Sequence, residues 1–263
     1  GWAMLVGGLA LLWPRRFWPA AARAVLLALC MGFFFGAAQQ VSVTQMATGL
    51  YTYPLFVTLL AGPLLGERIG VWRLGALALG AVGCGFVLNP FADVFTIYQV
   101  VPVFAGFFYA CNILVLRRYC SRESPLALAF AVNLIFLVTG SIGALVMALL
   151  PMDPAVRGQL SFLLTGWPEL TTVLVAILAG LAVLNLFGNL FLSRAYQTAD
   201  SSLLAPLDFS YLLLVALWGR LLFESWPTPL AVLGMSMIAA AGMITAIREQ
   251  RRQRQQPAGQ EPG

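Results

Sequence analysis

The chain has 263 residues, of which 60% are apolar and 10% are charged. Soluble globular domains carry about 25% charged residues, so this composition excludes an ordinary soluble domain and predicts a membrane protein. The net charge of +5 does not indicate nucleic-acid binding, because the arginines lie in short loops between apolar segments and not on one basic face.

Nine apolar segments follow one another along the chain, and most have the length of about 20 residues that a helix needs to cross a bilayer. They are apolar on all sides, which excludes the alternating strands of a membrane barrel. The first segment stops at Pro14-Arg15-Arg16 and is too short to span, so we expect a helix whose beginning is missing. The segments cover residues 1–13, 24–45, 47–65, 71–88, 94–116, 126–150, 171–193, 202–223 and 229–247.

The chain repeats itself after a shift of 157 residues. Residues 29–67 align with residues 186–224 without a gap, with eleven identical positions. Both copies contain Gly-x-Leu-Leu-x-Glu, which ends at Glu67 in the first copy and at Glu224 in the second, and similarly spaced glycines follow in each. An internal repeat in an apolar chain indicates a membrane transporter.

The arginines alternate between the two ends of the segments. Thirteen lie in loops on one side and in the tail after residue 247, whereas Arg157 and Arg220 lie on the other side. The positive-inside rule therefore predicts a multi-pass protein of the cell (inner) membrane with a cytoplasmic C-terminus. The helix ending at Glu67 then runs inward and its counterpart ending at Glu224 runs outward, which predicts that the two copies are inverted.

The stretch from Pro54 to Arg68 and its counterpart from Ala205 to Glu224 resemble the two EamA domains of the drug/metabolite transporter superfamily. The second copy has Phe-Glu-Ser where the first has Gly-Glu-Arg. The resemblance implies an all-α membrane protein with two inverted repeats of five helices each. Here the first helix of the family is absent and the second is truncated, and the family's diverse substrates name no particular compound.

The resemblance and the repeat together divide the chain into three parts. Residues 1–90 form an incomplete first EamA-like repeat, and residues 91–247 form the second. Residues 248–263 are polar and rich in Gln and Pro, so we expect a disordered cytoplasmic tail.

Asp208 is the most unusual residue inside a predicted helix. It lies six residues into the segment 202–223, about 9 Å deep, and an intramembrane carboxylate usually faces the bundle interior or water. One interpretation is a residue that couples transport to a proton or binds a cation. The other is a structural partner for Arg194 or a cap near Pro206. No arginine is expected deep in the membrane, which argues against a strongly anionic substrate.

Other polar and aromatic residues are candidates for the substrate site, and each has a structural alternative. Amides could bind a substrate or join two helices, and tyrosines could form aromatic walls or pack. Pro54 and Pro206 could open a cavity or kink a helix, and Glu67 and Glu224 each are expected to cap the next helix. The remaining candidates are Tyr51, Tyr211, Asn185, Asn189, Gln40, Gln99 and Asn112.

The sequence therefore predicts a secondary transporter that exports a small metabolite or drug-like compound across the cytoplasmic membrane by alternating access. The chain has no histidine, no HExxH motif and no paired intramembrane carboxylates, and its cysteines show no CxxC spacing. We accordingly expect no enzyme activity, no cofactor and no metal. The alternatives are a non-transporting scaffold or an inactive fragment, and small-residue patterns such as Gly32-x3-Gly36 would permit a homodimer.

Overall fold

The computed structural model describes residues 13–65, 71–88, 96–120, 123–149, 169–198, 201–224 and 226–255. All regular structure in these ranges is helical. Four helical stretches are long and apolar enough to cross a membrane, namely Phe17–Gly36, Ile97–Tyr119, Pro125–Leu149 and Pro229–Arg248. The elements are α2 (Phe17–Gly36), α3 (Val43–Leu50), α4 (Tyr53–Leu65), α5 (Val71–Leu88), the 3₁₀ turn η1 (Ile97–Gln99), α6 (Val101–Tyr119), α7 (Pro125–Leu149), α10 (Thr172–Thr198), α11 (Ser201–Phe223) and α12 (Pro229–Gln255).

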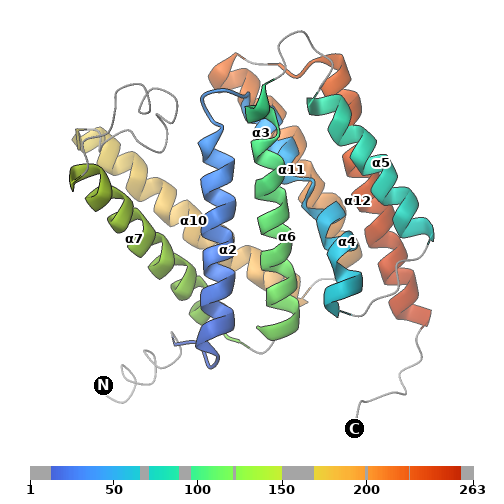
Figure 1. The fold of residues 1–263 in the computed structure, drawn as a ribbon, viewed down its shortest axis with the longest axis horizontal. Coiled ribbons are helices and arrows are strands. Elements are labelled where there is room, and N and C mark those ends of the chain that lie inside the picture. Colours follow the sequence, from blue (N-terminus) through green and yellow to red (C-terminus); the bar gives the residue numbers. More distant parts are fainter. Residues whose placement is uncertain are drawn as a thin grey trace.

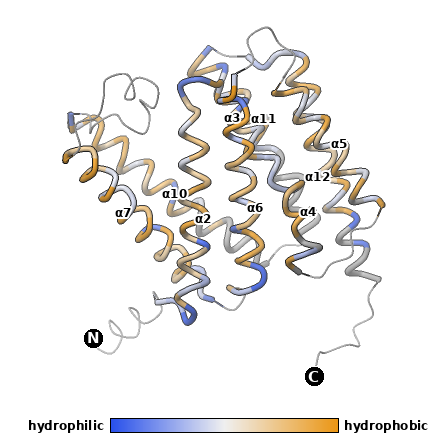
Figure 2. Tube along the Cα trace, viewed as in Figure 1, coloured by the Kyte–Doolittle hydropathy of each residue, from blue (hydrophilic) through white to orange (hydrophobic). Residues whose placement is uncertain are grey.

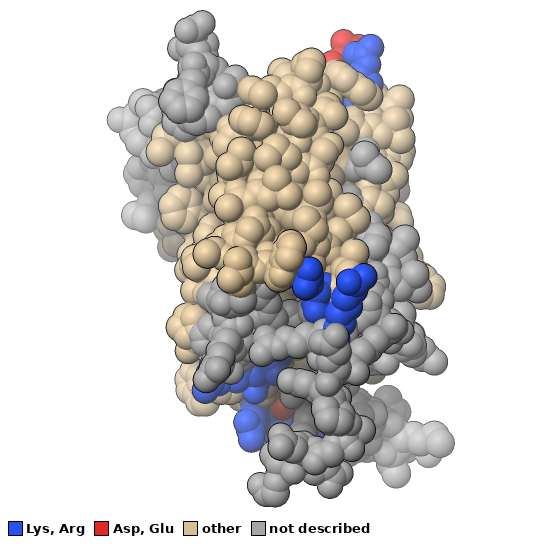
Figure 3. Space-filling model, turned by 90° about the vertical axis from the view of Figure 1, so that its right-hand side faces the viewer, with Lys and Arg blue, Asp and Glu red and all other residues tan. Residues whose placement is uncertain are grey.

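The long helices cross the molecule in alternating directions (Figure 1). Helix α2 begins and α12 ends at the same end of the bundle. The helices are hydrophobic along most of their length, and hydrophilic residues gather near their ends (Figure 2). Seen from its α5 and α12 side, the molecule shows a broad uncharged surface between charged residues near its two ends (Figure 3). This distribution is what a bilayer-spanning bundle requires.

Two predicted segments, 24–45 and 47–65, differ from the helices in the structure. The segment 24–45 is instead helix α2, which starts at Phe17 and ends at Gly36. The segment 47–65 is two helices, α3 and α4. The start of α3 is set by Ser42, whose hydroxyl accepts from the Gln45 N–H at 3.2 Å while the Gln45 side chain accepts from the Ser42 N–H at 3.0 Å. This capping box begins a new helix inside an apolar run. The break between α3 and α4 lies beside Pro54.

The remaining predicted segments that the structure describes agree with helices within a few residues. The segments 94–116 and 229–247 differ in the following ways. The segment 94–116 becomes η1 followed by α6, whose Pro102 suits a helix start. The apolar part of α12, Pro229–Arg248, agrees with the predicted segment 229–247. The helix continues to Gln255, so the first residues of the tail predicted to be disordered are helical. The predicted segment 1–13 lies almost wholly outside the described residues, as does the chain after Gln255.

Two helix pairs dominate the packing. Helix α2 lies against α6, where Cys30 and Ala105 are fully buried. Helix α5 lies against α12, and a Cβ added at Gly83 would lie 2.7 Å from the carbonyl oxygen of Gly234. The absence of side chains at this crossing lets the two backbones approach closely.

Helices α5 and α12 come from equivalent positions of the sequence repeat, and they run antiparallel. Val87 at the end of α5 clusters with Ala231 at the start of α12. The guanidinium of Arg248 near the other end of α12 lies 4.1 Å from the ring centroid of Trp72 at the start of α5. Helices α5 and α12 therefore pack against each other in antiparallel orientation, with contacts near both ends of the pair.

Helix α10 differs from the others because apolar residues all around its described part are exposed. Examples are Val173 at 69%, Leu184 at 71% and Phe191 at 71% exposure. A helix that is apolar on every side without packing needs lipid or another apolar surface around it.

Candidate substrate site

Four tyrosines form a row that crosses the bundle from α11 to α6. The rings of Tyr51 and Tyr211 stack with centroids 5.1 Å apart and planes inclined by 11°. Tyr53 meets Tyr51 edge-on at 5.8 Å, and Tyr109 meets Tyr53 edge-on at 4.9 Å. Tyr51 is only 7% exposed, whereas Tyr211 is 39% exposed. The row is thus buried on the α3 side and open at its α11 end.

A break between α3 and α4 holds this row in place. Tyr51 lies in the two-residue break, and Pro54 is the second residue of α4. Proline has no N–H, so the Leu50 carbonyl cannot receive the bond that a continuous helix would supply. Instead the Leu55 N–H donates to the Thr52 carbonyl at 3.0 Å. The structure thus interrupts the helix where Pro54 is predicted to loosen it, and broken helices often line the binding sites of transporters.

Close packing against α6 fixes the position of the break. A Cβ added at Gly106 of α6 would lie 2.6 Å from the Thr52 hydroxyl oxygen and 2.8 Å from the Gly49 carbonyl oxygen. The Thr52 hydroxyl itself donates to the Gly49 carbonyl at 2.6 Å, which satisfies it locally. The broken segment therefore has no room to move toward α6.

Two of the predicted amides are found with buried, unpartnered oxygens. Asn112 in α6 is 3% exposed, and no hydrogen-bond donor in the described chain reaches its Oδ1. Gln99 lies in η1 at the opposite end of α6 from Arg117, and its Oε1 is buried in the same unsatisfied state. An unpaired buried acceptor costs about 1–3 kcal/mol, so each of these oxygens requires an explanation.

One arginine lies deeper in the bundle than the sequence predicts. Arg23 is expected in a loop, but α2 starts at Phe17, which places Arg23 about 9 Å into the helix. Its side chain is half-buried, and its Nε is buried without an acceptor among the described residues. It lies within electrostatic range of Tyr109 and Cys120. The prediction that Arg23 lies in a loop is therefore wrong.

The other predicted polar residues lie at these places in the structure. Gln40 lies in the exposed turn after α2, because the helix ends at Gly36 and not at residue 45. Asn185 is exposed on α10. The backbones of Asn189, Pro206 and Asp208 are helical, and their side chains lie outside the described part of the chain.

The predictions for the equivalent glutamates Glu67 and Glu224 of the two repeats have different outcomes. Glu67 lies outside the described residues. Glu224 follows α11 with a positive φ of 52°, and its carbonyl accepts from the Arg220 guanidinium at 3.4 Å. The hydroxyl of Thr228, which accepts from the Ala231 N–H at 3.2 Å, caps α12 instead. The prediction that Glu224 caps the next helix is therefore wrong, since a better placed cap lies closer to the helix start.

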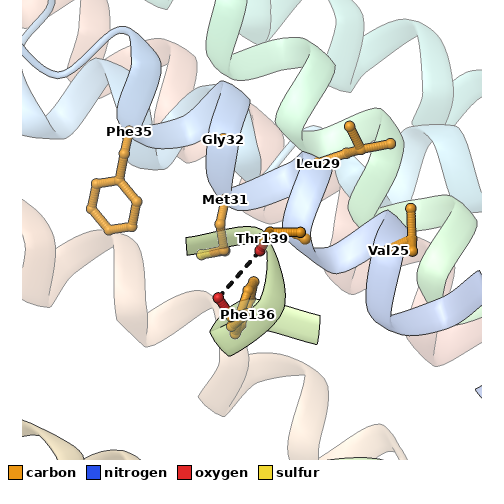
Figure 4. Close-up of a pocket in the computed structure, with 8 residues that line it drawn as sticks. Val25, Leu29, Met31, Gly32, Phe35, Phe136 and Thr139 are labelled. Carbon is orange, nitrogen blue, oxygen red and sulfur yellow. Dashed lines mark hydrogen bonds between the residues drawn. The ribbon is translucent and has the colours of Figure 1, made fainter. Parts of the chain in front are cut away.

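A separate apolar pocket lies between α2 and α7 and has a volume of about 390 Å³ (Figure 4). The Thr139 hydroxyl, the polar side-chain group of this lining, donates to the Ile135 and Phe136 carbonyls at 2.8 and 3.2 Å. It therefore has no hydrogen left to offer a ligand, and the pocket suits an apolar occupant. Its lining consists of Val25, Ala28, Leu29, Met31, Gly32, Phe35, Phe136 and Thr139, none of which is a predicted site residue.

Sequence reasoning missed two features that shape this region. Tyr53 connects Tyr51 to Tyr109 in the tyrosine row. Its position directly before the candidate Pro54 could have identified it as a site residue. Glu123, between α6 and α7, accepts from the backbone N–H groups of Arg15 and Arg16 at 2.8 and 2.9 Å. A carboxylate here compensates the positive end of α2, and only the folded chain shows that residues so distant in sequence meet.

The four cysteines are free thiols. Cys120 lies at the end of α6, where burial raises the pKa of its thiol although Arg23 and Arg16 act in the opposite direction. A thiol with a raised pKa stays protonated near neutral pH and is unreactive.

Comparisons with known proteins point to transport. No family model matches the chain. It is 31% identical over 206 residues to the riboflavin transporter of Vibrio cholerae serotype O1, a match that covers 78% of this chain and 63% of that protein. It is 29% identical over 249 residues to the riboflavin transporter of Rhizobium johnstonii, covering 94% and 76%. The chain therefore spans less than two thirds of the Vibrio protein.

Other relatives agree with this assignment. The pseudopaline exporter CntI of Pseudomonas aeruginosa is 25% identical over 223 residues, covering 83% of this chain and 71% of the exporter. A solved crystal structure has the same fold, with a TM-score of 0.50 and 18% identity over 95% of this chain and 83% of that one. These relatives are transporters and not enzymes, as is expected for this chain, and with its apolar helices they show a multi-pass membrane protein.

Proposed function

We propose that this protein is a secondary transporter of the EamA type that carries a planar aromatic metabolite of the flavin class across the cell membrane by alternating access. The Tyr51–Tyr211 stack is the observation that carries the proposal. It joins α3 of the first copy to α11 of the second copy, beside a broken helix. A site at such a junction changes its exposure when the two halves move against each other.

The inverted arrangement of the two copies is part of this proposal. It is supported by the antiparallel crossing of α5 and α12, which occupy equivalent positions in the repeat. The alternating helix directions in Figure 1 agree with it, since equivalent helices then point in opposite directions. A cytoplasmic C-terminus follows from the arginine distribution.

The flavin class is favoured by the aromatic row together with two riboflavin transporters among the relatives. Stacked and edge-on tyrosines offer flat apolar faces to a planar ring, and aromatic pairs of this kind gain about 0.5–1.5 kcal/mol beyond area burial. Tyr211, the exposed member of the row, is where such a ring would first make contact. We infer that the substrate inserts beside Tyr211.

Uptake of riboflavin into proteoliposomes tests this proposal. The expressed chain should give saturable uptake, and Tyr211→Ala should lower it about tenfold, the equivalent of one lost aromatic contact. Phe130→Ala is the matched control, because Phe130 is also aromatic and also 39% exposed but lies on α7. Absence of saturable riboflavin uptake, or an equal loss in both variants, would reject the flavin assignment.

A further inference from the structure

The interface between α2 and α6 contains two buried polar groups that the fold does not explain. Along α6, Ala105, Tyr109, Leu116 and Cys120 pack toward α2. Asn112 lies three residues after Tyr109 and four before Leu116, which places it on the same helix face. The Asn112 side chain is 3% exposed and its Oδ1 is unpaired. We infer from its position that it is directed into this interface.

Arg23 lies on the matching face of α2. Ala20, Leu27 and Cys30 pack toward α6, and Arg23 is three residues after Ala20 and four before Leu27, so it shares their face. Its buried Nε has no acceptor among the described residues. The interface thus holds an unpaired donor on one helix and an unpaired acceptor on the other.

These two groups are connected to the tyrosine row. Arg23 is within electrostatic range of Tyr109, and Tyr109 meets Tyr53 edge-on. Tyr109 and Arg23 are both half-buried, so this end of the row retains some accessible surface. The row therefore has an aromatic end at Tyr211 and a polar end at Arg23 and Asn112.

We propose that Arg23 and Asn112 form the polar end of the substrate site and select a substrate that presents a cyclic imide. An imide has an N–H flanked by two carbonyls, so its N–H can donate to Asn112 Oδ1 while a neighbouring carbonyl accepts from Arg23 Nε. A carboxylate would satisfy Arg23 but would place a second acceptor against Asn112 Oδ1, which is unfavourable. The flavin ring system carries such an imide at one edge, and this inference rests on the proposed function.

A role in substrate recognition can be distinguished from a structural role by substitutions that remove the polar atoms of Arg23 and Asn112 but preserve side-chain size. Arg23→Met and Asn112→Leu replace buried polar groups with apolar ones of similar size, and this leaves a folded protein equally or more stable when those groups have no partner. We expect an unchanged or higher thermal midpoint for both variants in detergent. A lowered midpoint would show that the two residues are structural, and would overturn the inference.

Binding of two flavins gives the second readout. The probes are riboflavin and its N3-methyl derivative, in which the imide N–H is blocked, and binding is followed by quenching of flavin fluorescence. The intact chain should bind riboflavin at least tenfold more tightly than the N3-methyl derivative, the usual effect of one lost hydrogen bond in a buried site. Asn112→Leu should bind the two probes equally, and Arg23→Met should weaken both.

The outcomes distinguish this inference from the proposed function. Equal binding of both probes by the intact chain, with saturable uptake of riboflavin, overturns the polar end and leaves flavin transport in place. Absence of riboflavin binding overturns both. Asn133 lies on α7, where it is exposed and donates to the Ala129 carbonyl at 2.9 Å, so Asn133→Leu is the control for loss of an intramembrane amide.

Discussion

Single residues decide which parts of this bundle can come close together. Gly106 faces Thr52 and the carbonyl oxygen of Gly49 at distances that leave no room for a methyl group. Gly32 on α2 has nothing within 4 Å of an added Cβ. The same residue type is therefore a packing requirement in one helix and replaceable in another.

This contrast gives a paired prediction. Gly106→Ala should destabilise the protein by about 1–3 kcal/mol, because the clash involves backbone atoms that cannot move aside easily. Gly32→Ala should be neutral or stabilise α2 by up to about 1 kcal/mol, since alanine is the better helix former. Thermal denaturation in detergent measures both changes. Equal effects of the two substitutions would show that the close approach of α3 and α6 is not required.

A second prediction at this scale concerns Asp208, three residues before Tyr211 in α11. If its carboxylate couples transport to a proton, Asp208→Asn should abolish uptake driven by a pH gradient and leave substrate exchange intact. Proteoliposomes with and without the gradient separate the two activities. Unchanged gradient-driven uptake would remove Asp208 as the coupling residue.

At the scale of elements, the informative feature is a membrane segment built from two short helices. The break at Tyr51 lies between the capping box that starts α3 and the proline that starts α4. Because backbone groups in a membrane need partners inside the protein, such a break persists only where neighbouring helices enclose it. Here α6 encloses it, through Gly106 and Pro102.

Pro54→Ala tests whether the break serves transport. The new N–H can donate to the Leu50 carbonyl, so α3 and α4 should merge into one helix and turn Tyr51 away from Tyr211. We expect riboflavin uptake to fall at least tenfold while the amount of folded protein is unchanged. Pro63→Ala, at an exposed position of α4, is the control. Normal uptake by Pro54→Ala would mean that the break has no role in the transport cycle.

At the scale of the whole molecule, the arginines predict the orientation and small residues let α5 and α12 approach each other closely. The described arginines at the start of α2 and the end of α6 lie at the end of the bundle where α12 stops (Figure 1). The α5–α12 pair, which buries Gly83 against Gly234, joins the first copy to the second. The predicted orientation and the α5–α12 contact therefore depend on different residues.

Reporter fusions test the orientation. An enzyme active only in the cytoplasm should be active when it is fused after Gln255, and inactive when it is inserted between α7 and α10. The physical reason is the excess of arginine at the α12 end, which resists translocation. The opposite pattern would exclude the predicted orientation but would not test the proposed inversion of the two copies.

Much of this protein follows from its sequence, because a bilayer leaves few choices. Apolar runs of 20 residues must form helices, so the segments 126–150, 202–223 and 71–88 are helices with almost the predicted bounds. The candidates Tyr51, Tyr211 and Asn112 were identified as polar or aromatic residues in apolar helices. Pro54 is predicted to open or kink its helix and the break lies beside it, whereas Pro63 lies inside α4 without ending it.

Only the tertiary structure decided which of these residues meet. Periodicity places Tyr51 and Tyr211 in helices 160 residues apart in sequence, but their stacking depends on how α3 packs on α11. The sequence predicts Arg23 in a loop, because an apolar window cannot show that α2 begins at Phe17, ahead of its most apolar part. Local patterns fix which segments are helical, whereas the burial of a charge and the partners of an aromatic ring depend on long-range packing, which has no local signature.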